Sequence, residues 1–257
     1  MRLARILALS VVLVALVAGG MAIALAGSGS AKAPPTKARA TTYARAVNLR
    51  ASDVHGLIVT GASYAAKGPL GAGGGACGVA VPAGAVVGIY SQTFQRLGAS
   101  TNASREYTQG VASVVYVMRS AALASRELAA VTAVPGDPTV VTCLKRYVES
   151  IRLEEEDERS VTGRKPIGEP IFSDAEVSAL RSSAGAMQAD GLQIKAHSAV
   201  RSPGMKGPFN FYEGCLAFAV GPAVVMLEDT GTPRSFPAVT ERRLLALLYR
   251  RAKAHKL

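Results

Sequence analysis

A long apolar segment at the N-terminus limits what the chain can fold into more than any other feature. It extends from Ile6 to Ala26, is interrupted only by one serine and a Gly-Gly pair, and follows Arg2 and Arg5. A helix that is apolar on every side needs lipid or a large core around it. The segment therefore predicts an export signal or a membrane anchor, and a buried helix of a soluble protein is the least favoured alternative.

Cleavage and retention of this segment both stay open. Ala24-Leu25-Ala26 offers a small-x-small cleavage site before Gly27, whereas a helix of this length measures about 31 Å, close to the thickness of a bilayer core. Arg2 and Arg5 favour an orientation that places the rest outside the cytoplasm. We expect an extracytoplasmic protein, secreted or anchored to the outer face of the cell membrane. The segment contains no cysteine that could accept a lipid.

The remaining chain divides into a linker and one domain. Residues 27–42 are small, basic or proline residues, which predict a flexible tether. The predicted organisation is a signal peptide or membrane anchor at 1–26, a linker at 27–42 and an extracytoplasmic domain at 43–257. With 257 residues, 49% of them apolar, the chain can build a sizeable core.

Hydropathy patterns predict an antiparallel sheet. Val111–Met118 is apolar on both faces, which indicates a central strand. Asp190-Gly191 is predicted to form a hairpin turn, Gly221-Pro222 to join two strands, and Asp229-Thr230-Gly231 to end the last of them. The other expected strands are Val86–Phe94, a period-two segment around Leu192–Ser198, Phe209–Val220 and Ala223–Leu227.

Capping residues predict three helices. Ser120 is expected to cap a helix that ends at Ala133, and Asp137-Pro138 to begin an amphipathic helix. A final helix begins near Pro237, with Leu244, Leu247 and Leu248 toward the sheet and Arg242, Arg243, Arg250, Arg251 and Lys253 toward water. This order of elements predicts an α+β fold, an antiparallel sheet packed by helices on one face.

Several of these motifs occur together in one known group. They are Val47-Asn48-Leu49 followed by Asp53, the strand Ser113–Met118 leading into an Ala-rich helix, Asp137-Pro138 before a helix with Cys143, and the Gly221 strand before an Arg-rich final helix. In this order they resemble the actinobacterial extracytoplasmic sensor-type domain of some receptor serine/threonine kinases and related cell-envelope lipoproteins. The resemblance covers Tyr43 to Lys253. It implies a sheet packed by helices with a groove for a ligand or partner, although this chain has no kinase domain and no lipid-acceptor cysteine.

Three cysteines allow one disulfide and one odd thiol. Cys77 lies in a Gly-rich loop that gains most from a covalent link, Cys143 on an apolar helix face and Cys215 in a strand. The favoured pair is Cys77 with Cys143; Cys77 with Cys215 and three free thiols stay open as alternatives. A catalytic cysteine is less favoured, because Cys77 has no basic neighbour in the sequence that would lower its pKa.

Motif searches favour no enzyme class. Gly73–Gly78 matches G-x-G-x-x-G but follows no strand and precedes no helix, and neither G-x-S-x-G nor H-E-x-x-H occurs. His55, His197 and His255 are isolated, and the acidic run Glu154–Glu158 lacks the spacing of a calcium loop. We expect no catalytic activity, no cofactor and no metal ion. An unrecognised hydrolase is the least favoured alternative.

The chain is basic, with 29 Lys and Arg against 18 Asp and Glu. The cations are scattered except on the final helix, from Arg242 to Lys256, and they lack the aromatic neighbours of a nucleic-acid site. The charge predicts weak contact with anionic lipid or an acidic wall polymer, or solubility alone, and no nucleic-acid partner.

Two functions fit these observations. The first is a cell-envelope binding or sensor-like module without catalytic activity that takes an unknown small ligand or an envelope protein. The second is an envelope structural or protein-interaction factor, anchored by its N-terminal helix. Candidate groove residues, chosen as amphipathic or charged side chains on or beside strands, are Tyr90, Tyr116, Arg119, Asn210 and Tyr212. The favoured alternative for two of them is structural, with Tyr116 in the core and Arg119 at a strand end.

Overall fold

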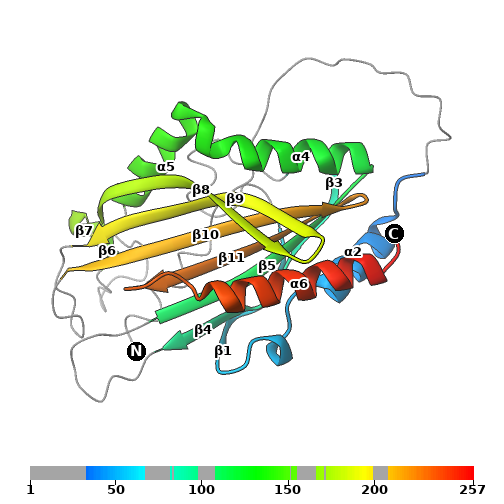
Figure 1. Cartoon of the computed structure of the whole chain (residues 1–257), viewed down its shortest axis with the longest axis horizontal. Helices are drawn as coiled ribbons and strands as arrows, with labels where there is room; N and C mark the ends of the chain where they lie inside the picture. Colours follow the sequence, from blue (N-terminus) through cyan, green and yellow to red (C-terminus); the bar gives the residue numbers. More distant parts are fainter. Residues whose placement is uncertain are drawn as a thin grey trace.

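The domain is built on one large antiparallel sheet. The computed structural model describes residues 33–66, 82, 84–97, 108–150, 152–154, 166–170, 172–198 and 208–257. The strands of the nine-stranded sheet are β1 (Ile58–Gly61), β2 (Tyr64–Ala65), β3 (Ala85–Tyr90), β4 (Thr93–Leu97), β5 (Thr108–Met118), β8 (Ser173–Ala184), β9 (Met187–Ser198), β10 (Phe209–Val220) and β11 (Ala223–Thr232). Their order is β1-β4-β5-β11-β10-β9-β8 (Figure 1), and β3 also pairs with β5, while β2 pairs with β3. A second sheet pairs β6 (Arg152–Glu154) with β7 (Pro166–Pro170).

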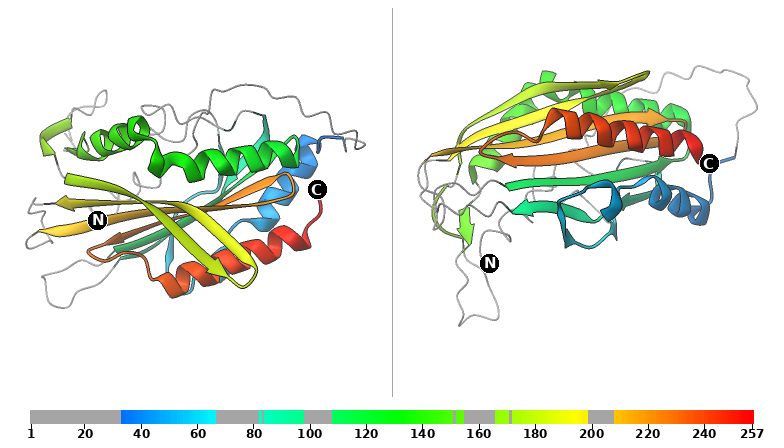
Figure 2. Two further views of the ribbon diagram at one scale, coloured as in Figure 1. Left: turned by 45° about the horizontal axis from the view of Figure 1, so that its top comes forward. Right: turned by 60° about the horizontal axis from the view of Figure 1, so that its bottom comes forward.

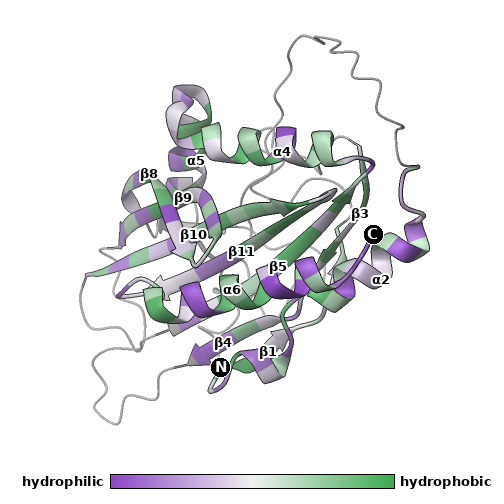
Figure 3. Ribbon diagram, turned by 45° about the vertical axis from the view of Figure 1, so that its right-hand side comes forward, coloured by the Kyte–Doolittle hydropathy of each residue, from purple (hydrophilic) through white to green (hydrophobic). Residues whose placement is uncertain are grey.

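The central strands are buried on both faces. Along β5, Val114 and Tyr116 pack into one hydrophobic core, while Val115 and Val117 pack into a second core on the other side. Figure 3 shows β5 hydrophobic along most of its length. The prediction of a central strand is confirmed, because a strand with a core on each side needs apolar residues at successive positions.

Helices cover both faces of the sheet (Figure 2). The helices α4 (Ala121–Ala133) and α5 (Pro138–Ser150), with the 3-10 turn η2 (Val134–Gly136) between them, cover one face. The helices α2 (Lys37–Val47) and α6 (Ala238–Ala254) cover the other. The α+β class and the antiparallel sheet are confirmed, but the prediction of helices on one face alone is corrected. A sheet with two apolar faces needs a helical layer on each.

The predicted helix starts are confirmed in detail. Ser120 Oγ accepts a hydrogen bond from the Leu123 amide at 3.3 Å. Asp137 Oδ1 accepts bonds from the amides of Thr139 and Val140, at 2.9 and 3.2 Å. Each cap satisfies amide groups that the first helical turn leaves without partners.

Two predicted turns lie inside strands. The hairpin between β8 and β9 turns at Gly185, which has a φ of 64°, and not at Asp190-Gly191. Gly191 pairs with Leu216 in the middle of the sheet, where a β-carbon would collide with the carbonyl oxygen of Cys215. Asp229-Thr230-Gly231 likewise belongs to β11, which continues to Thr232. The glycines that indicated turns therefore permit close approach of backbones.

Two other boundaries differ from the sequence prediction. The predicted strand Val86–Phe94 is two strands, β3 and β4, separated at Ser91-Gln92. The predicted linker at 27–42 overlaps α2, which begins at Lys37 after Thr36 Oγ1 accepts the Arg39 amide at 3.3 Å. Ala40 in that helix is fully buried. The folded part therefore begins before Tyr43.

The helices α2 and α6 lie side by side. The Tyr43 hydroxyl donates a hydrogen bond to the Ala252 carbonyl at 3.0 Å. The 3-10 turn η1 (Ala51–Asp53), which follows α2, holds α6 through Asp53, whose two carboxylate oxygens accept bonds from Arg251 at 2.7 and 2.8 Å. Arg251 was predicted to face water, and this buried ion pair corrects that prediction.

None of the helices in the described ranges is long and apolar enough to span a bilayer. The apolar run at residues 6–26 lies outside those ranges. Its role as a signal or anchor therefore stays a prediction.

Candidate functional site

A group of polar side chains, four of them buried and one exposed, lies on the side of the sheet that α4 and α5 cover. It comprises Tyr64 on β2, Tyr90 on β3, Tyr116 on β5, Cys215 on β10 and Glu228 on β11, and we name it the tyrosine–glutamate cluster. Tyr64 pairs directly with Tyr90, and Cys215 with Glu228. Tyr90, Tyr116 and Cys215 belong to the α4/α5 core. Five strands thus converge on one polar site.

Glu228 is the chemically unusual member of the cluster. Glu228 is only 4% exposed, and neither carboxylate oxygen has a hydrogen-bond partner at strict geometry, although the Tyr90 hydroxyl is near enough to act on the pKa of this carboxyl group. Burial raises its pKa to about 8, against a smaller lowering effect of the Tyr90 hydroxyl. A carboxylate in an apolar core is costly unless it is protonated or paired. The neutral acid is therefore the stable form at neutral pH.

The tyrosines connect Glu228 to the surface. Burial raises the pKa of Tyr90 and of Tyr116 far above the usual range, and the charge of Glu228 acts in the same direction. The two hydroxyls influence each other's pKa, yet Tyr116 Oη lacks a partner at strict hydrogen-bonding geometry. The ring of Tyr90 stacks on that of Tyr64 at a centroid distance of 4.8 Å, and Tyr64 is 51% exposed. The cluster therefore reaches solvent through Tyr64.

Cys215 lies among carboxyl groups. Burial raises the pKa of its thiol, and the charges of Glu228, Glu213 and Asp229 raise it further. Glu213 is itself buried. The pKa of Tyr147 on α5 is raised mainly by burial, and the charge of Glu213 raises it further. A thiol with a raised pKa and no access to solvent is a poor nucleophile.

We expect Cys215 in the folded protein to react with a soluble disulfide reagent about 10³-fold more slowly than a small free thiol, because reaction requires the core to open. The measurement is the rate of thiol release at pH 8 with and without denaturant. Arg119→Cys supplies an exposed thiol as a control, since Arg119 is exposed. Equal rates for Cys215 and this control thiol would show that the core is open.

The structure supports the part of the disulfide prediction that concerns Cys143. Cys143 on α5 is disulfide-bonded, and Cys215 is free and buried. The alternatives with Cys215 in the bond, or with three free thiols, disagree with this state. Cys77 is the remaining cysteine of the sequence but lies outside the described residues, so its pairing with Cys143 stays a prediction.

The structure brings together two of the five predicted groove residues. Tyr90 and Tyr116 are in the cluster, and Tyr116 is fully buried, as its core alternative required. Arg119 is exposed at the end of β5. Asn210 and Tyr212 alternate with Phe211, so their side chains face the α2/α6 side. There Asn210 Oδ1 lies 3.4 Å from His197 Nδ1.

The sequence prediction did not include Glu228 because it ended the strand at Leu227. The local sequence offers no signal for it, because β11 changes from an apolar run to a polar run after Leu227 without alternation, yet all ten of its residues are buried. Asp229 faces the α2/α6 side opposite Gly214. Burial raises its pKa to about 8, with a further contribution from the charge of Glu241 on α6. Two consecutive buried acids thus lie on opposite faces of one strand.

Within the described ranges, His, Cys, Asp and Glu side chains nowhere gather in a group of three or more that could hold a metal ion. No family model, no curated protein and no solved structure matches this chain.

Proposed function

We propose that the protein is an exported cell-envelope binding or sensor-like module without turnover of its own, and that its ligand carries a cationic group, such as an amine, that binds at the tyrosine–glutamate cluster. The observation that carries this proposal is Glu228, whose two carboxylate oxygens are buried without a hydrogen bond of strict geometry and without a positive partner in the ion pairs of the described residues. Export is the prediction made from the N-terminal apolar run.

A cation fits the chemistry of the cluster. An ionised Glu228 needs a positive partner, because a buried carboxylate without one costs several kcal/mol. The faces of Tyr64 and Tyr90 carry the negative side of an aromatic quadrupole, which attracts an ammonium group. Tyr116 adds an unpartnered hydroxyl that can accept a hydrogen bond. The net charge of +11 opposes attraction at long range, so these short-range contacts have to supply the affinity.

The test is a thermal-shift screen of the full chain with three ligand sets, organic amines and amino sugars, neutral sugars, and sugar phosphates. A cationic ligand at a hundred times its Kd is expected to stabilise the fold by about 2.7 kcal/mol. For a domain of this size that raises the Tm by about 5–10 °C. Neutral and anionic compounds are expected to leave the Tm unchanged.

Two variants locate the binding site. Glu228→Gln is expected to abolish the shift, and Tyr116→Phe to weaken it. Tyr212→Phe is the matched control, because Tyr212 lies on the opposite face and loses the same atom. The proposal would be contradicted if the cationic ligand still raised the Tm of Glu228→Gln. It would also be contradicted if a substrate panel revealed turnover and the change of one Ser, Asp or Cys abolished that turnover.

One observation favours the alternative function, an envelope structural or protein-interaction factor. Exposed cations gather on α2 and α6, on the face away from the cluster. Capture of envelope proteins that depends on these cations, with no ligand found in the screen, would support this alternative.

A further inference from the structure

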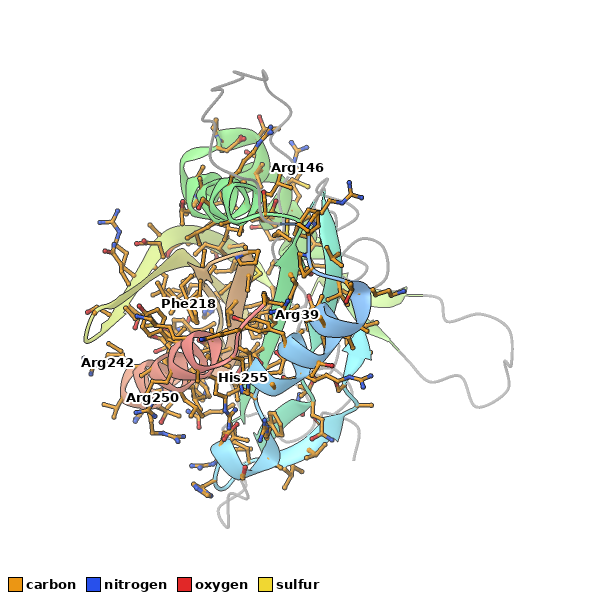
Figure 4. The ribbon with its side chains drawn as sticks, turned by 90° about the vertical axis from the view of Figure 1, so that its right-hand side faces the viewer. Arg39, Arg146, Phe218, Arg242, Arg250 and His255 are labelled. Carbon is orange, nitrogen blue, oxygen red and sulfur yellow. The ribbon has the colours of Figure 1, made fainter. Side chains whose placement is uncertain are left out.

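The helices α2 and α6 together present one strongly basic surface. Its exposed residues are Lys37, Arg39 and Arg45 on α2, and Arg242, Arg243, Arg250 and Lys253 on α6. We name this set the basic surface. In Figure 4, which looks along α6, Arg242 and Arg250 extend away from the sheet. The contact between Tyr43 and Ala252 fixes the two helices side by side.

Negative charge is almost absent from this layer. The two helices contain a single carboxylate, Glu241, which is 8% exposed. The neighbouring Asp53 is buried and bonded to Arg251. The layer on the other face is different, because α4 and α5 carry three cations, Arg126, Lys145 and Arg146, and two carboxylates, Glu127 and Glu149. The excess positive charge of the helices is therefore concentrated on one side of the molecule.

Few of these cations form ion pairs within the described part of the protein. Arg251 forms an ion pair with Asp53 and is not part of the basic surface. Arg243 donates a hydrogen bond to the Asp53 carbonyl at 2.9 Å, and Arg242 donates one to Ala238 of its own helix. None of the seven basic-surface residues is a member of the ion pairs Arg181–Asp190, Lys195–Glu176 and Arg251–Asp53. All seven side chains are exposed, and Lys253 Nζ also lies 5.3 Å from the ring centroid of Tyr249 on its own helix.

We propose that the basic surface docks on a bilayer that contains anionic lipid, and so holds the α2/α6 face against the membrane. Charge complementarity is the first argument, since clustered Lys and Arg residues bind anionic headgroups. The position of α2 is the second. Only ten residues, 27–36, separate the apolar run from α2, and an extended chain of that length spans at most about 35 Å. An anchored chain therefore keeps the basic surface close to headgroups.

The expected effect is large because the charges act together. Each Lys or Arg near an anionic surface strengthens association by about fivefold at low salt. Removing three charges is then expected to lower the ratio of docked to undocked domain about a hundredfold. High salt is also expected to lower the ratio of docked to undocked domain, because the Debye length falls to about 3 Å at 1 M ionic strength.

The experiment uses the full chain in nanodiscs of phosphatidylcholine alone or mixed equally with phosphatidylglycerol. The measured quantity is the rate of acetylation of Lys253, with Lys145 on α5, in the layer on the other face of the sheet, as the internal reference. We expect the anionic lipid to slow acetylation of Lys253 at least fivefold relative to Lys145. One molar NaCl or the variant R45Q/R242Q/R250Q is expected to abolish this protection. The control variant R119Q/R146Q/R181Q removes the same charge from exposed positions elsewhere and is expected to keep it.

Three results would overturn the proposal. The first is an equal Lys253 rate in both lipids at low salt. The second is equal loss of protection in the two triple variants, which would indicate an effect of net charge. The third is protection by soluble polyphosphate in phosphatidylcholine nanodiscs combined with none by phosphatidylglycerol, which would identify an acidic polymer as the occupant. An unchanged Tm in each variant confirms that the fold is retained.

Discussion

Glu228→Gln is expected to raise the free energy of unfolding by about 3 kcal/mol at pH 7. Burial raises the pKa of Glu228 from 4.5 to about 8, so the folded protein holds a proton that the unfolded chain releases. The stability that this neutral acid contributes is fully present below pH 4.5 and is lost as the pH rises to about 8. A glutamine side chain has nearly the same shape as a protonated glutamate but does not titrate. The stability of the variant therefore does not fall as the pH rises through this range.

The measurement is denaturant unfolding of both proteins at pH 5, 7 and 8.5. The two proteins are expected to differ by less than about 1 kcal/mol at pH 5 and increasingly at higher pH. Glu176→Gln is the control, because the Glu176 side chain is 69% exposed and forms a surface ion pair with Lys195 at 3.7 Å. Parallel pH profiles for the wild type and Glu228→Gln would contradict the prediction. They would indicate a cation beside Glu228 in the folded protein.

Asp53→Ala is expected to lower the free energy of unfolding by about 3–5 kcal/mol, since it leaves a charged Arg251 without its partner. The side chains of Asp53 and Arg251 are only 8% and 18% exposed, and two hydrogen bonds join them. Burial acts to raise the pKa of Asp53, but the hydrogen bonds and charges of Arg251 and Arg50 together lower it below its usual value. The pair joins η1 to α6, so its loss loosens the whole α2/α6 layer.

The same unfolding experiment tests this prediction. Asp190→Ala is the matched control, because its partner Arg181 is 80% exposed and such a surface pair is worth less than about 1 kcal/mol. The double variant Asp53→Ala/Arg251→Met is expected to recover part of the stability, since no charge stays buried. The Asp53 contribution is present at neutral pH and is lost as the pH falls through the lowered pKa, the opposite sense to Glu228. Equal losses for Asp53→Ala and Asp190→Ala would contradict this account.

Local sequence determined the elements whose signals are complete within a few residues. Ser120 and Asp137 begin helices because each supplies an oxygen to amides two or three positions along the chain. The double-sided apolar pattern of Val111–Met118 predicted a central strand, and burial of both faces explains why that pattern is sufficient. Such signals act over one turn or one strand and need no partner to be recognised.

The tertiary structure overrode local signals where two distant segments meet. Asp190-Gly191 has the composition of a hairpin turn, but the missing side chain of Gly191 instead lets β9 approach the Cys215 carbonyl of β10. The sequence prediction places residues 37–42, the first half of α2, in a linker because they are small or basic and include no large apolar side chain. The helix folds because Ala40 and Ala44 fit closely against the second face of the sheet, which the prediction had left uncovered.

The tyrosine–glutamate cluster and the basic surface both depend on contacts between segments that are remote in the sequence. Period-two alternation places Glu228 on one face of its strand, but only the register of β11 with β5 and β10 brings it beside Tyr90, Tyr116 and Cys215. Arg251 and Asp53 are 198 positions apart. The sequence by itself determined the central strand β5, the starts of α4 and α5 and the excess of positive charge. Which acids are buried without partners, and which cations remain at the surface, was decided by the pairing of strands and the packing of α2 on α6, because burial and charge pairing depend on neighbours in space.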